Sequence, residues 1–143
     1  MSKTETFSEI AENFEFIDDW EDRYRYVIEL GKALPVLDDA RRTPASKVEG
    51  CASQVWLVPD LRHENGADRL FFEGDSDAVI VRGLIAILIA LVSGRPLSEI
   101  RDLDIKAELT RLQLDQALTS QRSNGLRAMV ARIEALSGAS AAA

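Results

Sequence analysis

The chain has 143 residues, of which 46% are hydrophobic and 29% are charged, so it is long enough to bury one core and short for two typical domains. Its formal net charge is −7 at pH 7 and it has no long basic run, which disfavours nucleic acid as the main partner because phosphate binding needs clustered Lys and Arg. One cysteine excludes an intramolecular disulfide, and one histidine excludes a metal site of four soft ligands.

The beginning of the chain gives an expectation about the compartment. The first ten residues, MSKTETFSEI, carry an acidic residue early and contain no apolar stretch typical of a secretion signal. We therefore expect a cytoplasmic protein with a single domain over residues 1–143.

Two amphipathic helices are predicted next. The first has an apolar side chain at every third or fourth position: Phe7, Ile10, Phe14 and Ile17. The second has an apolar stripe from Trp20 to Leu34, is capped by Asp18 or Asp19, and is followed by Pro35. Together they predict a helical hairpin whose aromatic residues fill a core.

A change of periodicity predicts a small antiparallel sheet. Residues 37–46 are charged and contain proline, as expected of a surface connection. SQVWLVPD, from Ser53, and RLFFEGD, from Arg69, are rich in β-branched and aromatic residues and predict two strands. The intervening LRHENGAD contains Asn65-Gly66, a pair typical of a hairpin turn.

Helices dominate the rest of the chain. Residues 76–94 are apolar nearly all round, with Ser76 as the expected N-cap and Gly94 as the expected stop. This run is shorter than a membrane span and carries Arg82, so we expect a buried central helix. Further helices are predicted over residues 96–100, 106–118 and 126–136, and residues 137–143 are expected to form a flexible tail.

Cys51 lies between Gly50 and two small residues, Ala52 and Ser53, where a connection gives way to a strand. Gly50 permits an unusual backbone angle, and the small residues crowd the sulfur little, so a loop here can present a thiol. A lone cysteine is also often a small buried hydrophobe. The local sequence leaves both interpretations open.

The surroundings of Cys51 restrict its chemistry if the thiol is reactive. A cysteine hydrolase needs a histidine base, and the sole histidine, His63, is expected roughly 20 Å away at the far end of the strand. A redox sensor needs nearby cations and often a resolving cysteine, yet Lys47 is the nearest cation in sequence and a second thiol is absent. A sulfur carrier needs one accessible thiol that attacks a sulfur activated on a partner.

Four segments in order resemble the SufE family, which includes the CsdE proteins: YVIELGKALP, VEGCASQVWL, GDSDAVIVRGLIAIL and QRSNGLRAMVARI. The resemblance spans residues 7–136. The sequence departs from the family pattern at Ala52, where glutamine is usual, and at Arg82, where lysine is common.

The resemblance implies an α+β fold in which a small antiparallel sheet packs against several helices, as in the scaffold protein IscU. It implies that Cys51 accepts persulfide sulfur from a pyridoxal-phosphate cysteine desulfurase of the SufS or CsdA kind. The protein would stimulate that enzyme and relay the sulfur to an iron–sulfur scaffold. It would hold no cofactor of its own beyond a transient persulfide. From charge and hydropathy we expect it to bind neither nucleic acid nor membrane, and the sequence leaves open whether it is a monomer or a homodimer. The alternatives are a desulfurase adaptor that carries no sulfur and a redox-sensing thiol protein.

The resemblance also points to residues around the thiol, each of which has an ordinary structural explanation. Asp75 and Asp77 flank a predicted helix start, where they either favour the helix dipole or contact the cysteine loop and the desulfurase. Arg122 precedes the last predicted helix and opposes its dipole, so it either docks or tethers or is simply solvated. Lys47 and Gly50 either tune the cysteine loop or belong to an ordinary connection.

Overall fold

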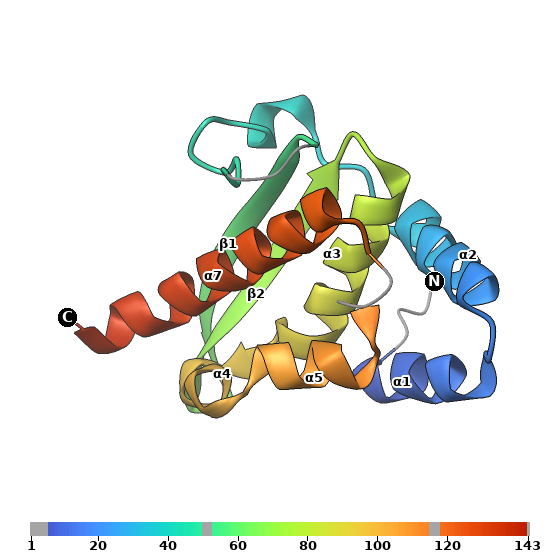
Figure 1. The fold of residues 1–143 in the computed structure, drawn as a ribbon. Coiled ribbons are helices and arrows are strands. Elements are labelled where there is room, and N and C mark those ends of the chain that lie inside the picture. Colours follow the sequence, from blue (N-terminus) through green and yellow to red (C-terminus); the bar gives the residue numbers. More distant parts are fainter. Residues whose placement is uncertain (1–5, 50–52, 115–117, 143) are drawn as a thin grey trace.

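The computed structural model describes residues 6–49, 53–114 and 118–142, and Figure 1 shows their arrangement. The helices are α1 Phe7–Phe16, α2 Trp20–Ala33, α3 Val79–Val92, α4 Leu97–Asp102, α5 Ile105–Arg111 and α7 Ser120–Ala142, with a short 3₁₀ turn, η1, at Asp39–Arg41. The strands are β1 Val55–Glu64, β2 Ala67–Ser76 and β3 Arg95–Pro96, in an antiparallel sheet of order β1-β2-β3. The predicted α+β class is confirmed.

Side-chain caps fix where the first two helices begin. Thr6 Oγ1 accepts a hydrogen bond from Glu9 N at 3.2 Å, and the Glu9 carboxylate accepts one from Thr6 N at 3.0 Å, which forms a capping box. Asp19 Oδ1 accepts from Glu21 N at 3.1 Å, so Asp19 rather than Asp18 caps α2. Both predicted helices are confirmed, but they do not form the expected hairpin, because α2 packs along α3 rather than along α1.

Two glycines allow α2 and α3 to pack with their backbones in contact. A Cβ atom on Gly83 would lie 2.0 Å from the Val27 carbonyl oxygen, and one on Gly31 would lie 2.3 Å from the Val79 carbonyl oxygen. Arg82, beside Gly83, donates from Nε to the Gly31 carbonyl at 3.0 Å and therefore satisfies a carbonyl near the end of α2. The close crossing and this bond lock the two helices together.

β1 and β2 form a long hairpin that projects beyond the core. Asn65 and Gly66 have φ values of 53° and 75°, as the predicted turn requires. Both strands extend through the polar segment expected between them, because this exposed half of the hairpin can carry polar side chains. Ser76 still pairs with Val55, so its predicted role as the N-cap of the central helix is wrong.

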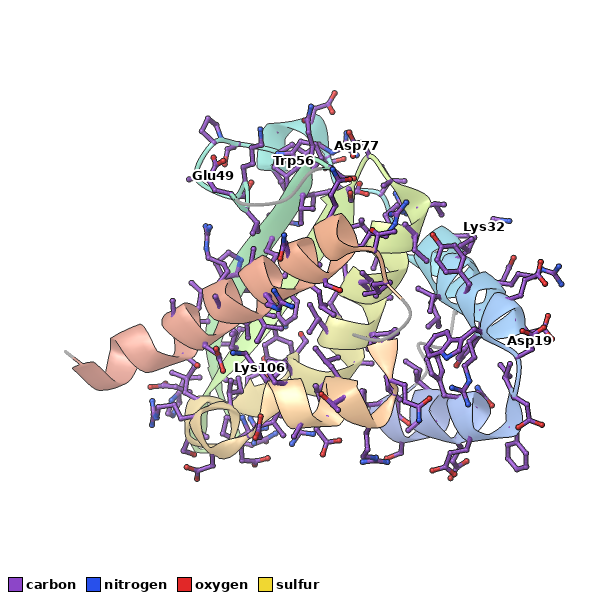
Figure 2. All side chains as sticks on the ribbon, viewed as in Figure 1. Asp19, Lys32, Glu49, Trp56, Asp77 and Lys106 are labelled. Atoms are coloured by element: carbon purple, nitrogen blue, oxygen red, sulfur yellow. The ribbon has the colours of Figure 1, made fainter. Side chains whose placement is uncertain are left out.

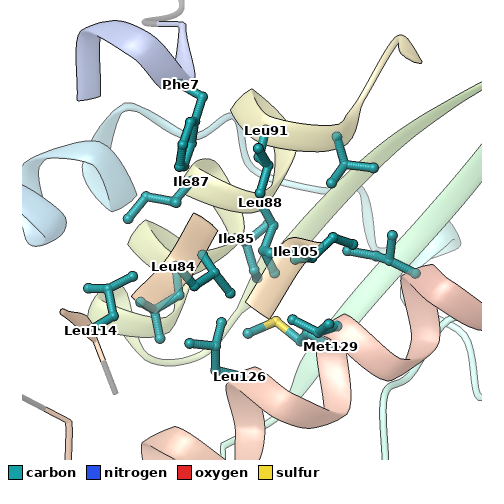
Figure 3. Packing of buried hydrophobic residues seen from close by; sticks show 14 of the residues in the cluster. Phe7, Leu84, Ile85, Ile87, Leu88, Leu91, Ile105, Leu114, Leu126 and Met129 are labelled. Atoms are coloured by element: carbon teal, nitrogen blue, oxygen red, sulfur yellow. The ribbon is translucent and has the colours of Figure 1, made fainter. Parts of the chain in front are cut away.

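α3 is the centre of the hydrophobic core, as its sequence predicts. Figure 3 shows Leu84, Ile85 and Leu88 of α3 beside Leu126 and Met129 of α7. The core also takes residues from α1, α5 and the inner face of the hairpin. The main chain leaves α3 through Gly94, whose φ of 90° confirms the expected stop.

The last third of the chain differs from prediction in three elements. β3 was not predicted, since it has two residues and contains a proline. α5 ends at Arg111 instead of continuing to residue 118, and Gln113 has a positive φ of 59°. α7 begins at Ser120 and continues to Ala142, so Arg122 lies in its first turn rather than before it.

Within the described ranges, no helix combines the length and the apolar character needed to cross a membrane. The flexible tail over residues 137–143 and the single domain stay predictions.

Candidate functional site at the base of the cysteine loop

Cys51 and Gly50 lie outside the described residues, but both ends of the segment that contains them are described. Val48 N donates to the Val55 carbonyl at 2.8 Å, and Leu57 N donates to the Ser46 carbonyl at 2.8 Å. Lys47 faces Trp56 in an antiparallel bridge. Residues 46–48 thus pair with the start of β1 through one isolated bridge, and they are here called the anchor strand. Residues 49–54, here called the cysteine loop, connect the two.

Asp77 holds the far end of the cysteine loop. Its carboxylate oxygen Oδ1 accepts a hydrogen bond from Gln54 N at 3.1 Å, and its own N–H donates to the Gln54 carbonyl at 3.3 Å. The side chain is exposed, and no helix-capping bond from Asp77 is present at α3, whose N-cap is Ala78. Figure 2 shows Asp77, Trp56 and Glu49 at the same end of the molecule. Asp77 therefore lies beside the cysteine loop.

Asp75, two residues earlier, is fully buried and lies at the end of β2. Its Oδ1 is 2.7 Å from Arg82 Nη1 and its Oδ2 is 2.6 Å from Arg42 Nη2. Burial alone would raise the pKa of Asp75, but hydrogen bonds from Leu37 N, Arg42 and Ser76 N and the charge of Arg82 together lower the pKa below its ordinary value. Asp75 is thus ionised although it is buried, and its contacts are of the kind that stabilise the fold.

Arg42 joins this buried charge to the strand that carries the cysteine loop. Its guanidinium carbon lies 5.1 Å from the centre of the Trp56 ring while Nη2 binds Asp75. The sequence interpretation treated residues 37–46 as a surface connection and missed this contact. Leu37 and Ser46 are buried, but the charged residues between them follow neither helical nor strand periodicity, so no sequence pattern indicates this contact.

A cavity of about 430 Å³ lies directly beside the described end of the cysteine loop. It is lined by residues from β1, α3 and the region around the start of α7: Ser53, Val55, Val81, Leu84, Thr119, Gln121, Arg122, Gly125, Leu126 and Met129. Ser53 and Arg122, far apart in sequence, therefore face the same space. The apolar lining can shelter a small reactive group, and Arg122 supplies the one cationic side chain among the described lining residues.

Arg122 is half-buried, and no described carboxylate lies within ion-pair distance of its guanidinium. Its backbone N–H donates to Thr119 Oγ1 at 3.3 Å, which fixes the start of α7 rather than the side chain. Its charge can stabilise an anionic group that enters the cavity. Lys47 has a different place: it is half-buried in the anchor strand, and its carbonyl accepts a hydrogen bond from Arg132.

The described residues support neither a histidine base for the thiol nor a metal site. His63 lies next to the hairpin turn, where its Nδ1 is 2.8 Å from Asp68 Oδ1, and the length of β1 separates it from the cysteine loop. Across the described part of the chain, no group of three or more His, Cys, Asp or Glu side chains is placed to hold a metal ion.

Comparisons with known proteins agree on one family. The family model described as "SufE: Fe-S metabolism associated domain" matches residues 8–137. An uncharacterized SufE-like protein of Rhizobium etli is 57% identical over 128 residues, covering 90% of this chain and 86% of the relative. A second such protein, from Rhizobium meliloti, is 50% identical over 129 residues, covering 90% of this chain and 92% of the relative.

A solved structure supports the fold independently. The solution structure of a hypothetical protein from Thermus thermophilus superposes with a TM-score of 0.70 and covers 96% of both chains. Its sequence is 20% identical, so it supports the α+β architecture and carries no argument about the site.

Proposed function

The chain belongs to the SufE family of Fe–S metabolism associated domains, and from this membership we propose that it is a sulfur carrier whose Cys51 accepts sulfur from a cysteine desulfurase. The family match over residues 8–137 is the observation that carries the proposal. The donor is a pyridoxal-phosphate enzyme of the SufS or CsdA kind, whose turnover the protein stimulates in the cytoplasm. The sulfur then passes to iron–sulfur cluster assembly.

The transfer is a thiol–persulfide exchange. The Cys51 thiolate attacks the terminal sulfur of the desulfurase persulfide, a new S–S bond forms on Cys51, and the S–S bond on the enzyme breaks. The desulfurase cysteine leaves as a thiolate, so the sulfur moves without net oxidation or reduction. Pyridoxal phosphate acts on the donor enzyme, and this chain needs no cofactor for the step.

Chain connectivity supports a place for the thiol near the cavity. Cys51 is two residues from Ser53, which lines the cavity, so their Cα atoms are within about 8 Å of one another. Because a free persulfide is easily reduced or oxidised, a resting position against the apolar lining would protect it. Docking of the desulfurase would then release the cysteine loop.

Arg122 and Asp77 support different parts of this proposal. Arg122 faces the cavity without a described carboxylate partner, and its charge favours an anionic thiolate or persulfide. Asp77 holds Gln54 through two hydrogen bonds, so breaking them is one way to free the end of the cysteine loop during docking. Neither residue needs to contact the sulfur that is transferred.

Intact-mass measurement tests the proposal directly. The protein is incubated with cysteine and a SufS- or CsdA-type desulfurase, and the wild type is compared with Cys51→Ser. We expect the wild type to gain the mass of a sulfur atom and Cys51→Ser to gain none, with the adduct removed by a thiol reductant. Sulfur on both forms, or on neither, would contradict the assignment of Cys51.

Desulfurase turnover in the same assay separates the alternatives. A carrier stimulates the enzyme only when Cys51 is present, whereas an adaptor stimulates it equally as wild type and as Cys51→Ser. A redox-sensing thiol would be modified by peroxide alone and would gain no sulfur from the desulfurase.

A further inference from the structure

Arg132 of α7 makes a contact that neither the sequence patterns nor the proposed function assigns. Its Nη2 donates to the Ala45 carbonyl at 2.6 Å and its Nη1 donates to the Lys47 carbonyl at 3.3 Å. The bonds join residues 85 and 87 positions apart in the chain. They therefore tie α7 to the anchor strand of the cysteine loop.

The pattern of carbonyls explains why one arginine binds both acceptors. The Ser46 carbonyl faces β1, where it accepts from Leu57 N. The carbonyls of Ala45 and Lys47, on either side of Ser46, instead both accept from the guanidinium of Arg132. The planar fork of a guanidinium reaches both, whereas a lysine ammonium offers a single point of contact.

Arg132 is free for this task because no described carboxylate forms an ion pair with it. It is half-buried, and hydrogen bonds from a charged donor are stronger than those between neutral groups. Met129, one turn earlier in α7, lines the cavity. The same helix thus forms a wall of the cavity and holds the anchor strand.

We propose that Arg132 is a positioning residue for sulfur acceptance: it fixes the anchor strand between β1 and α7 so that the cysteine loop starts at a set point, while Asp77 holds the other end at Gln54. This inference rests on the proposed function. A loop with fixed ends samples fewer positions, which raises the fraction of encounters in which the thiol is aligned with the donor sulfur. Arg132 itself does not touch the reacting atoms.

Hydrogen exchange of single amides tests the contact without any partner. The Val48 and Leu57 amides report pairing of the anchor strand with β1, and amides of α3 report the core. In Arg132→Gln we expect the Val48 and Leu57 amides to exchange about tenfold faster than in the wild type, while the amides of α3 are unchanged. In Arg132→Lys the exchange rates of these two amides should lie between those of Arg132→Gln and the wild type. The matched control is Arg127→Gln on the same helix, where Arg127 Nη1 binds Asn124 within α7. This control should exchange like the wild type.

Sulfur uptake from the desulfurase is the second readout. In Arg132→Gln we expect the maximal rate of uptake to fall about threefold to tenfold while the half-saturating desulfurase concentration stays unchanged, because alignment rather than docking is lost. Wild-type protection of Val48 and Leu57 in Arg132→Gln, or a wild-type uptake rate after protection is lost, would overturn the proposal. If Arg132→Gln also loses protection in α3, Arg132→Lys decides between the two explanations. Intermediate exchange of Val48 and Leu57 with α3 unchanged supports the proposal, and wild-type exchange contradicts it. If the wild type itself takes up no sulfur, the proposed function fails, and the exchange data still decide whether Arg132 fixes the anchor strand.

Discussion

Asp75 carries its charge in a fully buried position, where two arginines and two backbone N–H groups compensate it. We predict that Asp75→Asn lowers the free energy of unfolding by about 3 kcal/mol, because it leaves Arg82 and Arg42 without their shared anion. Urea denaturation at neutral pH measures this loss. The control is Asp22→Asn, which removes a surface pair with Arg25 and should cost less than about 1 kcal/mol.

The pH dependence of the same variant gives an independent check. Because the folded pKa of Asp75 is lowered, its charge stabilises the fold above the unfolded pKa, near 3.8, and this contribution is lost as the pH falls through the folded pKa. The stability difference between wild type and Asp75→Asn should therefore be complete at about pH 6 and shrink below about pH 4. A difference that stays constant across this range would show that charge is not its cause.

Asp77 allows function and stability to be separated at one residue. Asp77→Lys removes the acceptor for Gln54 N at an exposed position, so we expect a melting temperature within about 3 °C of the wild type. The rate of sulfur uptake from the desulfurase should change severalfold, since the end of the cysteine loop loses the side-chain half of its attachment. A large fall in melting temperature with unchanged uptake would instead assign Asp77 a structural role.

At the scale of elements, the α2–α3 crossing depends on the absence of a side chain at Gly83. We predict that Gly83→Ala costs about 3 kcal/mol, because the new Cβ would lie 2.0 Å from the Val27 carbonyl oxygen and the helices would have to separate. Gly138→Ala is the matched control: a Cβ there meets no atom within 4 Å, and helix propensity favours alanine. Urea denaturation should show the first variant destabilised and the second equal to or slightly above the wild type.

The elements that the sequence predicted well are those whose pattern is local. The apolar stripes of α1 and α2, the continuous apolar run of α3 and the Asn65-Gly66 turn each determine their element within a few residues. The anchor strand was not predicted because it consists of one bridge, between Lys47 and Trp56, which no local pattern in residues 46–48 indicates. Ser76 was misassigned because its pairing with Val55 outweighs its preference for a helix cap.

The residues of the candidate site also divide into those that a local motif indicates and those that only tertiary packing brings together. The motif around Cys51 identified the family, whereas the sequence left Asp77 open between the start of the central helix and the cysteine loop, and its bonds are to Gln54. The cavity was not predictable, because Ser53, Leu84 and Arg122 approach one another only when β1, α3 and α7 pack. Arg132 gave no signal at all, since its acceptors are main-chain carbonyls that any residue supplies.

At the scale of the whole molecule, one hydrophobic cluster extends from Phe7 in α1 to Ile133 in α7 and includes both strands of the hairpin. A core shared in this way predicts that the two ends of the molecule unfold together. The tryptophans lie at suitable places to test it. Trp20 packs against Phe14 near the α1–α2 corner, and Trp56 lies beside the cysteine loop under Arg42.

We therefore expect Trp20→Phe and Trp56→Phe, each with one remaining tryptophan, to show fluorescence transitions in urea that coincide with loss of helical circular dichroism in the same variant. The conservative change keeps an aromatic ring at each site, so the midpoints of the two variants should differ little. A fluorescence transition of Trp56 at lower urea than the helical signal would mean that the end carrying the cysteine loop opens before the core. The ion pairs of Asp75 argue against such early opening, because they join the segment before the anchor strand to β2 and α3 through a carboxylate buried among all three.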